Sequence, residues 1–201
     1  MFDRAVRRRI DPFLEQIAGA AKDRRIGADQ ITWAGFAIGL LCMVAVAQGW
    51  YGVGLILLLA TRLCDGLDGA VARLTGPTDR GAYLDIVLDF LFYAGFVFAC
   101  AIAQPQATLA AAFLIFSFVG TGTSFLAFAI IAAQRNWPVD VGGKKGFAHL
   151  GGLTEGTETI FVFVAMLLWP EAFATLAWIF GGLCWLTTFS RIATTLRTLR
   201  P

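Results

Sequence analysis

Charged residues, histidine and closely spaced cysteines are all scarce in this chain. Only 15% of the 201 residues are charged and 58% are hydrophobic, whereas a soluble domain usually has about 25% charged residues. The four cysteines lie far apart in apolar surroundings, so we expect small buried hydrophobes and neither disulfides nor metal ligands. This composition argues against an ordinary soluble domain and gives no sign of a nucleic-acid partner. It is typical of an integral membrane protein.

The first thirty residues also show no secretory signal. They carry charges throughout and contain no short apolar core followed by a cleavage site of small residues. We expect residues 1–27 to form a basic amphipathic segment on the cytoplasmic membrane surface, with its arginines facing anionic head groups. A simple orientation signal is the alternative.

Long uncharged runs predict an all-α polytopic fold with six transmembrane helices. A bilayer span needs about 20 apolar residues, and the uncharged run from Phe90 to Ala133 is long enough for two spans. It must fold back once, and Gln104-Pro105-Gln106 is the expected turn. The whole membrane domain, residues 28–201, is expected to have spans at 31–49, 50–74, 81–103, 107–134, 149–169 and 172–194.

The distribution of lysine and arginine predicts the orientation of these spans. All 16 basic residues lie outside the loops that follow the first, third and fifth spans. Because basic residues favour the cytoplasmic side, we expect both termini to face the cytoplasm in a multi-pass protein of the inner membrane.

Five aspartates interrupt the apolar chain around the predicted turn between the second and third spans: Asp65, Asp68, Asp79, Asp85 and Asp89. Residues three or four apart share one face of a helix, so Asp65 and Asp68 form one stripe and Asp85 and Asp89 form another. The two helices are antiparallel neighbours joined by a short loop, so the stripes can face each other at the cytoplasmic end. We expect Asp79 to be a solvated loop charge.

Four carboxylates that meet inside a membrane need a compensating charge. A charged side chain at the bilayer centre costs roughly 2.5 to 3.5 kcal/mol, and like charges at close range make ionisation harder still. Oxygen-only ligands suit hard ions, so we predict two divalent cations, Mg²⁺ or Mn²⁺, an arrangement typical of phosphate displacement. Gly69, Ala72 and Gly81 leave space for a nucleotide beside the acids, and Arg73 offers donors to phosphate. Solvated edge charges, or a cation or proton transporter, are the alternatives.

The pattern Asp65-x-x-Asp68-Gly69-x-x-Ala72-Arg73, followed by Gly81-x-x-x-Asp85-x-x-x-Asp89, resembles the signature of the CDP-alcohol phosphotransferases. Every fixed position of that signature is matched, and its place on the second and third of six spans is also similar. The resemblance implies a membrane enzyme, commonly a homodimer. Such an enzyme moves a substituted phosphoryl group from a CDP-alcohol, usually CDP-diacylglycerol, to an acceptor hydroxyl and releases CMP.

The resemblance also implies roles for single residues. Asp65 and Asp85 would bridge two metal ions, with Asp68 on one ion and Asp89 on the other. Asp89 would also be the general base that takes the acceptor's proton. The CDP moiety would lie against a set of signature residues and their neighbours: Asp65, Gly69, Ala72, Arg73, Thr78 and Gly81.

Two stretches differ from the family pattern. Many members carry Pro-Asn-x-Ile/Leu-Thr at the start of the first span; here Asp29 replaces the asparagine while Thr32 remains, and both are candidate CDP contacts. In the fifth span, Glu155 and Glu158 lack the arginines that stand beside such glutamates in inositol-phosphate-using members. The candidate acceptor-binding residues are Lys144, Lys145, Glu155 and Glu158. Structural pairing of the two glutamates with Arg62 or Arg191 is the alternative.

The leading hypothesis is therefore a CDP-diacylglycerol-dependent phosphatidyltransferase whose acceptor is a small polar alcohol. A phosphotransferase that uses CDP-choline or CDP-ethanolamine with a lipid alcohol acceptor is the alternative within the same chemistry. The signature does not separate these two enzymes, and it does not identify the acceptor.

Overall fold

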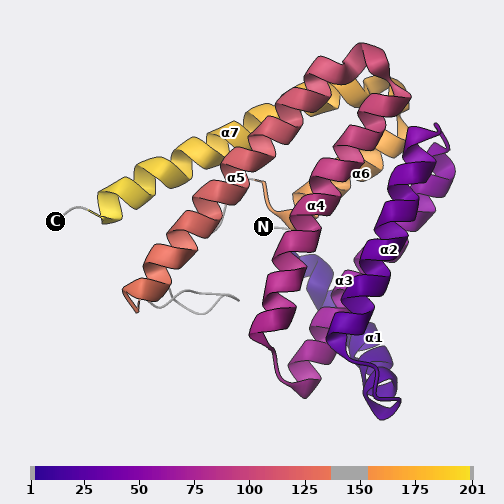
Figure 1. Ribbon diagram of the computed structural model, residues 1–201, viewed down its shortest axis with the longest axis vertical. Helices are drawn as coiled ribbons and strands as arrows, with labels where there is room; N and C mark the ends of the chain where they lie inside the picture. The colour runs from indigo at the N-terminus through magenta and orange to yellow at the C-terminus, as the bar shows by residue number, and fades with distance from the viewer. Residues whose placement is uncertain (1–2, 137–153, 200–201) are drawn as a thin grey trace.

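The computed structural model describes residues 3–136 and 154–199, with side chains from residue 13 onward. This part of the chain is helical throughout and contains no strand, as the sequence predicts (Figure 1). The long helices are α1 (Asp3–Asp23), α2 (Ala28–Ala47), α3 (Tyr51–Thr75), α4 (Asp79–Ala103), α5 (Thr108–Gln134), α6 (Gly156–Leu168) and α7 (Phe173–Thr198). Short 3-10 helices at Pro105–Ala107 and Pro170–Ala172 precede α5 and α7.

Four of these helices are long and apolar enough to cross a membrane by length and composition. They are α2, α4, and α5 and α7 with the 3-10 turns that precede them. Helix α3 has 25 residues, but Arg62, Asp65 and Asp68 make its second half polar. Helix α6 has only 13 residues, Gly156–Leu168, where the sequence predicts a span over 149–169. Residues 149–153 lie outside the described part. The count of six spans therefore stays a prediction.

The helices form two groups that meet at one end and diverge toward the other (Figure 1). Helices α3 and α4 both pack on α2, and α1 lies against α3. Helices α5 and α7 run side by side as a second group. The groups join where α4 turns into α5, and α6 packs on α3 and turns into α7 at the same end.

A glutamine in the predicted turn ties the joined end together. Helix α4 ends at Ala103, and the amide nitrogen Nε2 of Gln104 donates to the Pro170 carbonyl at 2.9 Å and to the Tyr51 hydroxyl at 3.3 Å. The turn expected at Gln104-Pro105-Gln106 is therefore present. It connects the α4–α5 turn to the α6–α7 turn and to the start of α3.

Small residues let the helices around the acidic signature approach closely. A Cβ atom added to Gly35 of α2 would lie 2.8 Å from the Cβ of Cys64 on α3. The core beyond this contact is aromatic: the rings of Phe96 and Phe163 stack with centroids 4.1 Å apart, and both side chains are fully buried. The four cysteines are free thiols; Cys42, Cys100 and Cys184 are buried, as expected, whereas Cys64 is half-buried.

Helix α1 packs against the back of the signature helix. Leu14 and Ala18 are buried in a cluster with Ala70 and Val71 of α3, and a Cβ on Gly66 would lie 2.8 Å from a methyl of Leu14. One face of α1 is therefore covered by protein. Contact of α1 with the membrane surface, and a division of the chain at residue 27, stay predictions.

Candidate active site

Three of the four predicted acids meet between α3 and α4. Asp65 of α3 and Asp85 and Asp89 of α4 each offer a carboxylate oxygen, and these oxygens lie within 4.8 Å of one another. The helical spacing puts Asp85 and Asp89 one turn apart on one face of α4. Because α3 and α4 both pack on α2, that face lies opposite Asp65. The structure thus joins the two stripes that the sequence defines.

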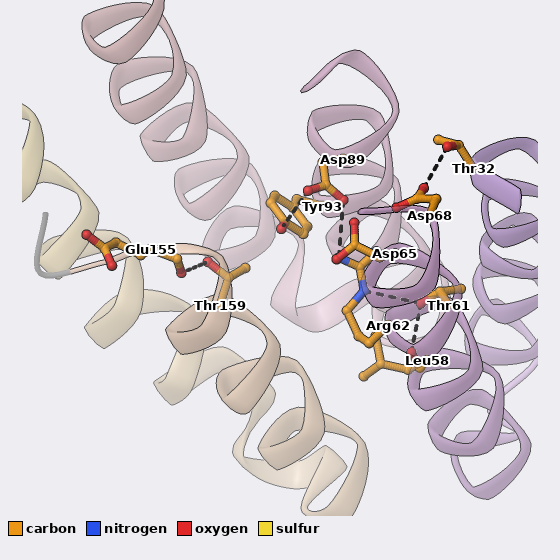
Figure 2. A network of polar contacts seen from close by, with 10 residues as sticks. All are labelled: Thr32, Leu58, Thr61, Arg62, Asp65, Asp68, Asp89, Tyr93, Glu155 and Thr159. Atoms are coloured by element: carbon orange, nitrogen blue, oxygen red, sulfur yellow. Dashed lines mark hydrogen bonds and ion pairs between the residues drawn. The ribbon is translucent and has the colours of Figure 1, made fainter. Parts of the chain in front are cut away.

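The fourth acid, Asp68, is oriented differently. Its Oδ2 accepts a hydrogen bond of 2.6 Å from the hydroxyl of Thr32 on α2, so this carboxylate turns toward α2 (Figure 2). Asp68 still lines the same small cavity as the other three acids. All four carboxylates therefore border one small volume, as the sequence predicts, and a neighbouring helix supplies a donor to one of them.

An arginine lies among these acids. The guanidinium nitrogen Nη1 of Arg62 donates to Oδ1 of Asp89 at 3.1 Å and lies 3.7 Å from Oδ2 of Asp65. The Tyr93 hydroxyl donates to the other oxygen of Asp89 at 3.3 Å. Figure 2 shows the Arg62 guanidinium beside Asp65 and joined to Asp89, with Tyr93 next to the other oxygen of Asp89. Both oxygens of Asp89 thus accept a hydrogen bond from a side chain.

A small cavity of about 30 Å³ lies at this cluster. Its walls include the four signature acids together with Thr32 and Arg62. About 10 to 15 Å³ of such space is enough to hold one water molecule. The space therefore suits small ions or water.

A second, larger cavity of about 380 Å³ shares Asp85 and Asp89 with the first one. Polar side chains reach it from the diverging helices: Thr121 of α5, Glu155 and Thr159 at α6, and Arg191 of α7. The guanidinium of Arg191 donates to the Thr121 carbonyl at 3.1 Å and lies over the Phe125 ring. Glu155 interacts electrostatically with Arg191 of α7. Of the two arginines considered as its partner, Arg191 therefore fits, whereas Arg62 lies in the acidic cluster.

The predicted CDP contacts lie at the ends of α3 and α4. Thr78 caps α4, and its hydroxyl oxygen accepts from the Gly81 amide at 3.0 Å. A Cβ on Gly81 would lie 3.4 Å from a carboxylate oxygen of Asp29, which pairs with Nε of Arg80 at 3.1 Å. On α3, the guanidinium of Arg73 lies 3.6 Å from the position of a Cβ on Gly69. Ala72 precedes that arginine on the same turn.

The predicted acceptor residues are only partly brought together. Glu155 lines the larger cavity, whereas the carboxylate of Glu158 accepts a hydrogen bond from the Glu155 amide at 3.3 Å and so caps the first turn of α6. Lys144 and Lys145 lie outside the described residues.

The donor set of the cluster fits a hard divalent cation. Three carboxylates with oxygens within 4.8 Å of one another provide oxygen ligands alone, which suits Mg²⁺ or Mn²⁺ better than softer transition metals. Asp68 can add a further oxygen from the wall of the same cavity.

The sequence profile described as CDP-alcohol phosphatidyltransferase matches residues 25–190, which include the whole acidic signature. The chain belongs to the CDP-alcohol phosphatidyltransferase family. The chain is also 49% identical over 201 residues to the inner membrane protein YnjF of Escherichia coli (strain K12), covering 100% of this chain and 98% of that protein. With the apolar helices, this relative supports a membrane location for the chain.

Two relatives with named activities are more distant. The archaetidylinositol phosphate synthase of Methanothermobacter thermautotrophicus is 40% identical over 91 residues, which is 45% of this chain and 43% of that protein. The crystal structure of Mycobacterium tuberculosis phosphatidylinositol phosphate synthase (PgsA1) with CDP-DAG bound matches with a TM-score of 0.73 over 90% of this chain and 92% of that one. At 19% identity, this likeness shows a shared fold.

Sequence reasoning gave no site role to Arg62, Tyr93 or Arg191, which line the two cavities. Arg62 precedes Asp65 by three positions and Tyr93 follows Asp89 by four, so helical spacing already puts each beside an acid. Arg62 and Arg191 enter the sequence analysis only as alternative partners for the glutamates. The place of Arg191 in the larger cavity depends on how α7 packs on α5, which local spacing does not reveal.

Proposed function

We propose that this protein transfers the phosphatidyl group of CDP-diacylglycerol to the hydroxyl of a small polar alcohol and releases CMP. Family membership supports the CDP-alcohol chemistry, and a protein of the same fold has CDP-DAG bound. One observation carries the proposal: Asp85 and Asp89 line both the small acidic cavity and the 380 Å³ cavity beside it. The phosphates of CDP-diacylglycerol at the small cavity and the acceptor in the larger cavity would meet at these two residues.

Asp65, Asp68, Asp85 and Asp89 would hold two divalent cations, Mg²⁺ or Mn²⁺. When bound, such ions stabilise charge on the reacting phosphoryl group and on the departing CMP. The protein's own contribution is to orient the carboxylates: Thr32 holds Asp68, while Arg62 and Tyr93 hold Asp89.

Asp89 is the proposed general base. A base needs hydrogen-bond reach to the proton that it removes, and Asp89 faces the larger cavity where the acceptor hydroxyl would lie. A carboxylate has about four lone-pair sites, so its bonds to Arg62 and Tyr93 leave capacity for that proton. The proton would pass from the acceptor oxygen to Asp89 as the oxygen forms its bond to phosphorus.

The CDP moiety is proposed to lie along the cytoplasmic ends of α3 and α4. Gly69, Ala72 and Gly81 present little side chain there, and Arg73 supplies a forked donor for phosphate. Thr78, Asp29 and Thr32 border the same region, Asp29 and Thr78 through their proximity to Gly81.

The acceptor is proposed to occupy the 380 Å³ cavity. Among the described residues that line it, Arg191 is the basic side chain and Glu155 lies near it. Inositol phosphate is one candidate acceptor, because two similar proteins are named for inositol phosphate products. Polyols, glycerol phosphate and amino alcohols such as serine also match a cavity with charges of both signs.

An acceptor panel tests the proposal. Purified protein is mixed with CDP-diacylglycerol, Mg²⁺ or Mn²⁺ and single alcohols, and both CMP release and the lipid product are measured. We expect CMP release that depends on one alcohol and yields its phosphatidyl ester. Turnover only with CDP-choline or CDP-ethanolamine and a lipid alcohol would instead establish the alternative donor. Ion flux through liposomes without CMP release would favour a transporter.

We also propose six spans, with both termini and the acidic cluster on the cytoplasmic side, in a homodimer. The exclusion of basic residues from alternate loops supports this topology. Reporter fusions at the two ends test the orientation, and chemical cross-linking in native membranes tests the dimer. A C-terminal reporter active only outside the cytoplasm would contradict the topology.

A further inference from the structure

Arg62 is held in the acidic cluster from several sides. Its Nη1 donates to Asp89 at 3.1 Å and lies 3.7 Å from Asp65. Its Nε donates to the Thr61 hydroxyl oxygen at 3.4 Å, and that hydroxyl donates to the Leu58 carbonyl at 2.7 Å. The acids and the chain of bonds back to the α3 backbone hold different nitrogens of one guanidinium.

Two aromatic rings support the same guanidinium. Its central carbon lies 5.2 Å from the centroid of the Phe92 ring and 5.9 Å from that of the Tyr93 ring. Cation–π contacts of this kind are strongest where water is excluded, and the Arg62 side chain is only 20% exposed. The acids, the Thr61 hydroxyl and the two rings therefore fix the position of the Arg62 guanidinium inside the protein.

The Arg62 guanidinium lies beside two of the acids that would bind a metal ion. Asp65 and Asp89 both contribute to the proposed metal site, and Arg62 already bridges these two acids. A positive charge a few ångströms away opposes the binding of a second positive charge, and the low dielectric of a membrane interior strengthens this effect. A divalent ion that binds Asp89 must displace the guanidinium or share the carboxylate with it.

We propose that Arg62 is a protein-borne cation of the acidic cluster, which positions Asp89 and competes with divalent cations for Asp65 and Asp89. This inference rests on the proposed function, because it presupposes that the cluster binds metal. It assigns to Arg62 two consequences: the cluster keeps a balancing charge when no metal is bound, and the divalent ion on the Asp89 side is held more weakly than the acids alone would hold it.

Metal titration tests the competition. Mn²⁺ binding to purified protein in detergent is measured by calorimetry and by the spin resonance of free Mn²⁺, without any substrate. We expect Arg62→Gln to bind Mn²⁺ at least about tenfold more tightly than the wild type, because a buried like charge has been removed. Arg62→Lys keeps the charge but loses the fork and the stacking, so its affinity should lie between the two.

Arg80→Gln is the matched control. It removes the same charge near the site, but Arg80 pairs with Asp29 and its side chain is 76% exposed. Solvent and salt screen such a charge, so we expect its Mn²⁺ affinity to stay within about twofold of the wild type. An equal gain in Arg80→Gln and Arg62→Gln would overturn the inference, since only overall charge would then matter.

Thermal unfolding gives a second measurement. At a given concentration, a ligand that binds the folded state more tightly stabilises it more, so Mn²⁺ should raise the Tm of Arg62→Gln more than that of the wild type. In EDTA, Arg62→Gln should have a lower Tm than the wild type, because its acidic cluster then lacks any counter-cation. If Arg62→Gln does not fold, the comparison of wild type with Arg62→Lys decides the question.

The outcomes separate this inference from the proposed function. Mn²⁺ binding that is unchanged or weaker in both Arg62 variants, with a wild type that binds normally, overturns the role of Arg62 alone. If neither the wild type nor the variants bind Mn²⁺, that result overturns both the competition and the proposed metal site.

Discussion

The Thr32 hydroxyl on α2 donates a hydrogen bond of 2.6 Å to the Asp68 carboxylate on α3. Asp68 is also the buried member of the four signature acids, with 7% of its surface exposed. The bond links a helix outside the acidic signature to the signature itself. It orients one carboxylate toward α2 while the other three lie within 4.8 Å of one another.

Thr32→Val tests the importance of this bond. A hydrogen bond to a charged group contributes about 1.5 to 3 kcal/mol, so we expect kcat/KM to fall by about tenfold or more. Thr32→Ser keeps the hydroxyl and should retain most activity. The matched control is Thr75→Val, since the Thr75 hydroxyl donates to the Val71 carbonyl within α3. Equal losses in both valine variants would show a general effect on folding.

Asp89→Asn tests the proposed base. The amide keeps the shape of the side chain but cannot take a proton, so we expect kcat to fall by about 10² to 10⁴-fold. Binding of CDP-diacylglycerol, measured by equilibrium binding of a labelled donor, should largely persist. Asp79→Asn changes an exposed acid at the start of the same helix and should be nearly neutral. Robust turnover by Asp89→Asn would remove the base from the mechanism.

Metal removal tests the oxygen-only donor set. We expect EDTA to abolish CMP release, because the reacting phosphoryl group then lacks its stabilising cations. Added Mg²⁺ or Mn²⁺ should restore the initial rate. Zn²⁺ is the useful comparison, since it prefers nitrogen and sulfur ligands. Full turnover in excess chelator would contradict the metal assignment.

Arg191→Gln tests the proposed acceptor cavity. Loss of the guanidinium removes a charged donor worth about 1.5 to 3 kcal/mol, so the KM for an anionic acceptor should rise by about tenfold or more. The KM for CDP-diacylglycerol should change little, because the donor is proposed to bind along α3 and α4. Arg197→Gln, on an exposed position of the same helix, is the control. A matching rise in both KM values would place Arg191 outside an acceptor-specific role.

Two glycine-to-alanine changes should have opposite effects on stability. At Gly35 the new Cβ would lie 2.8 Å from the Cβ of Cys64, so α2 and α3 must separate, at a cost of about 1 to 3 kcal/mol. At Gly182 in α7 no packing neighbour among the described residues lies within 4 Å of the new Cβ, and the helix should gain up to about 1 kcal/mol. Thermal unfolding in detergent measures both. A stabilised Gly35→Ala would contradict the close approach of α2 and α3.

Local pattern was sufficient to predict several parts of this structure. The turn at Gln104 follows from an uncharged run too long for one span, and the pairing of Asp85 with Asp89 follows from the helical repeat. The start of α6 did not follow from hydropathy: the fifth span is expected from residue 149, whereas α6 begins at Gly156, where the Glu158 carboxylate caps the helix. Hydropathy does not record such a cap.

Within single helices, the sequence by itself determined the family signature, the faces that carry the acids and the apolar lengths. These depend on the fixed spacing of residues along a helix. Only the tertiary structure decided three contacts between helices. Thr32 of α2 orients Asp68 of α3, Arg62 of α3 bonds to Asp89 of α4, and Arg191 of α7 lines the larger cavity. The physical reason is that contacts between helices depend on how closely their backbones approach, which small residues such as Gly35 control through three-dimensional packing.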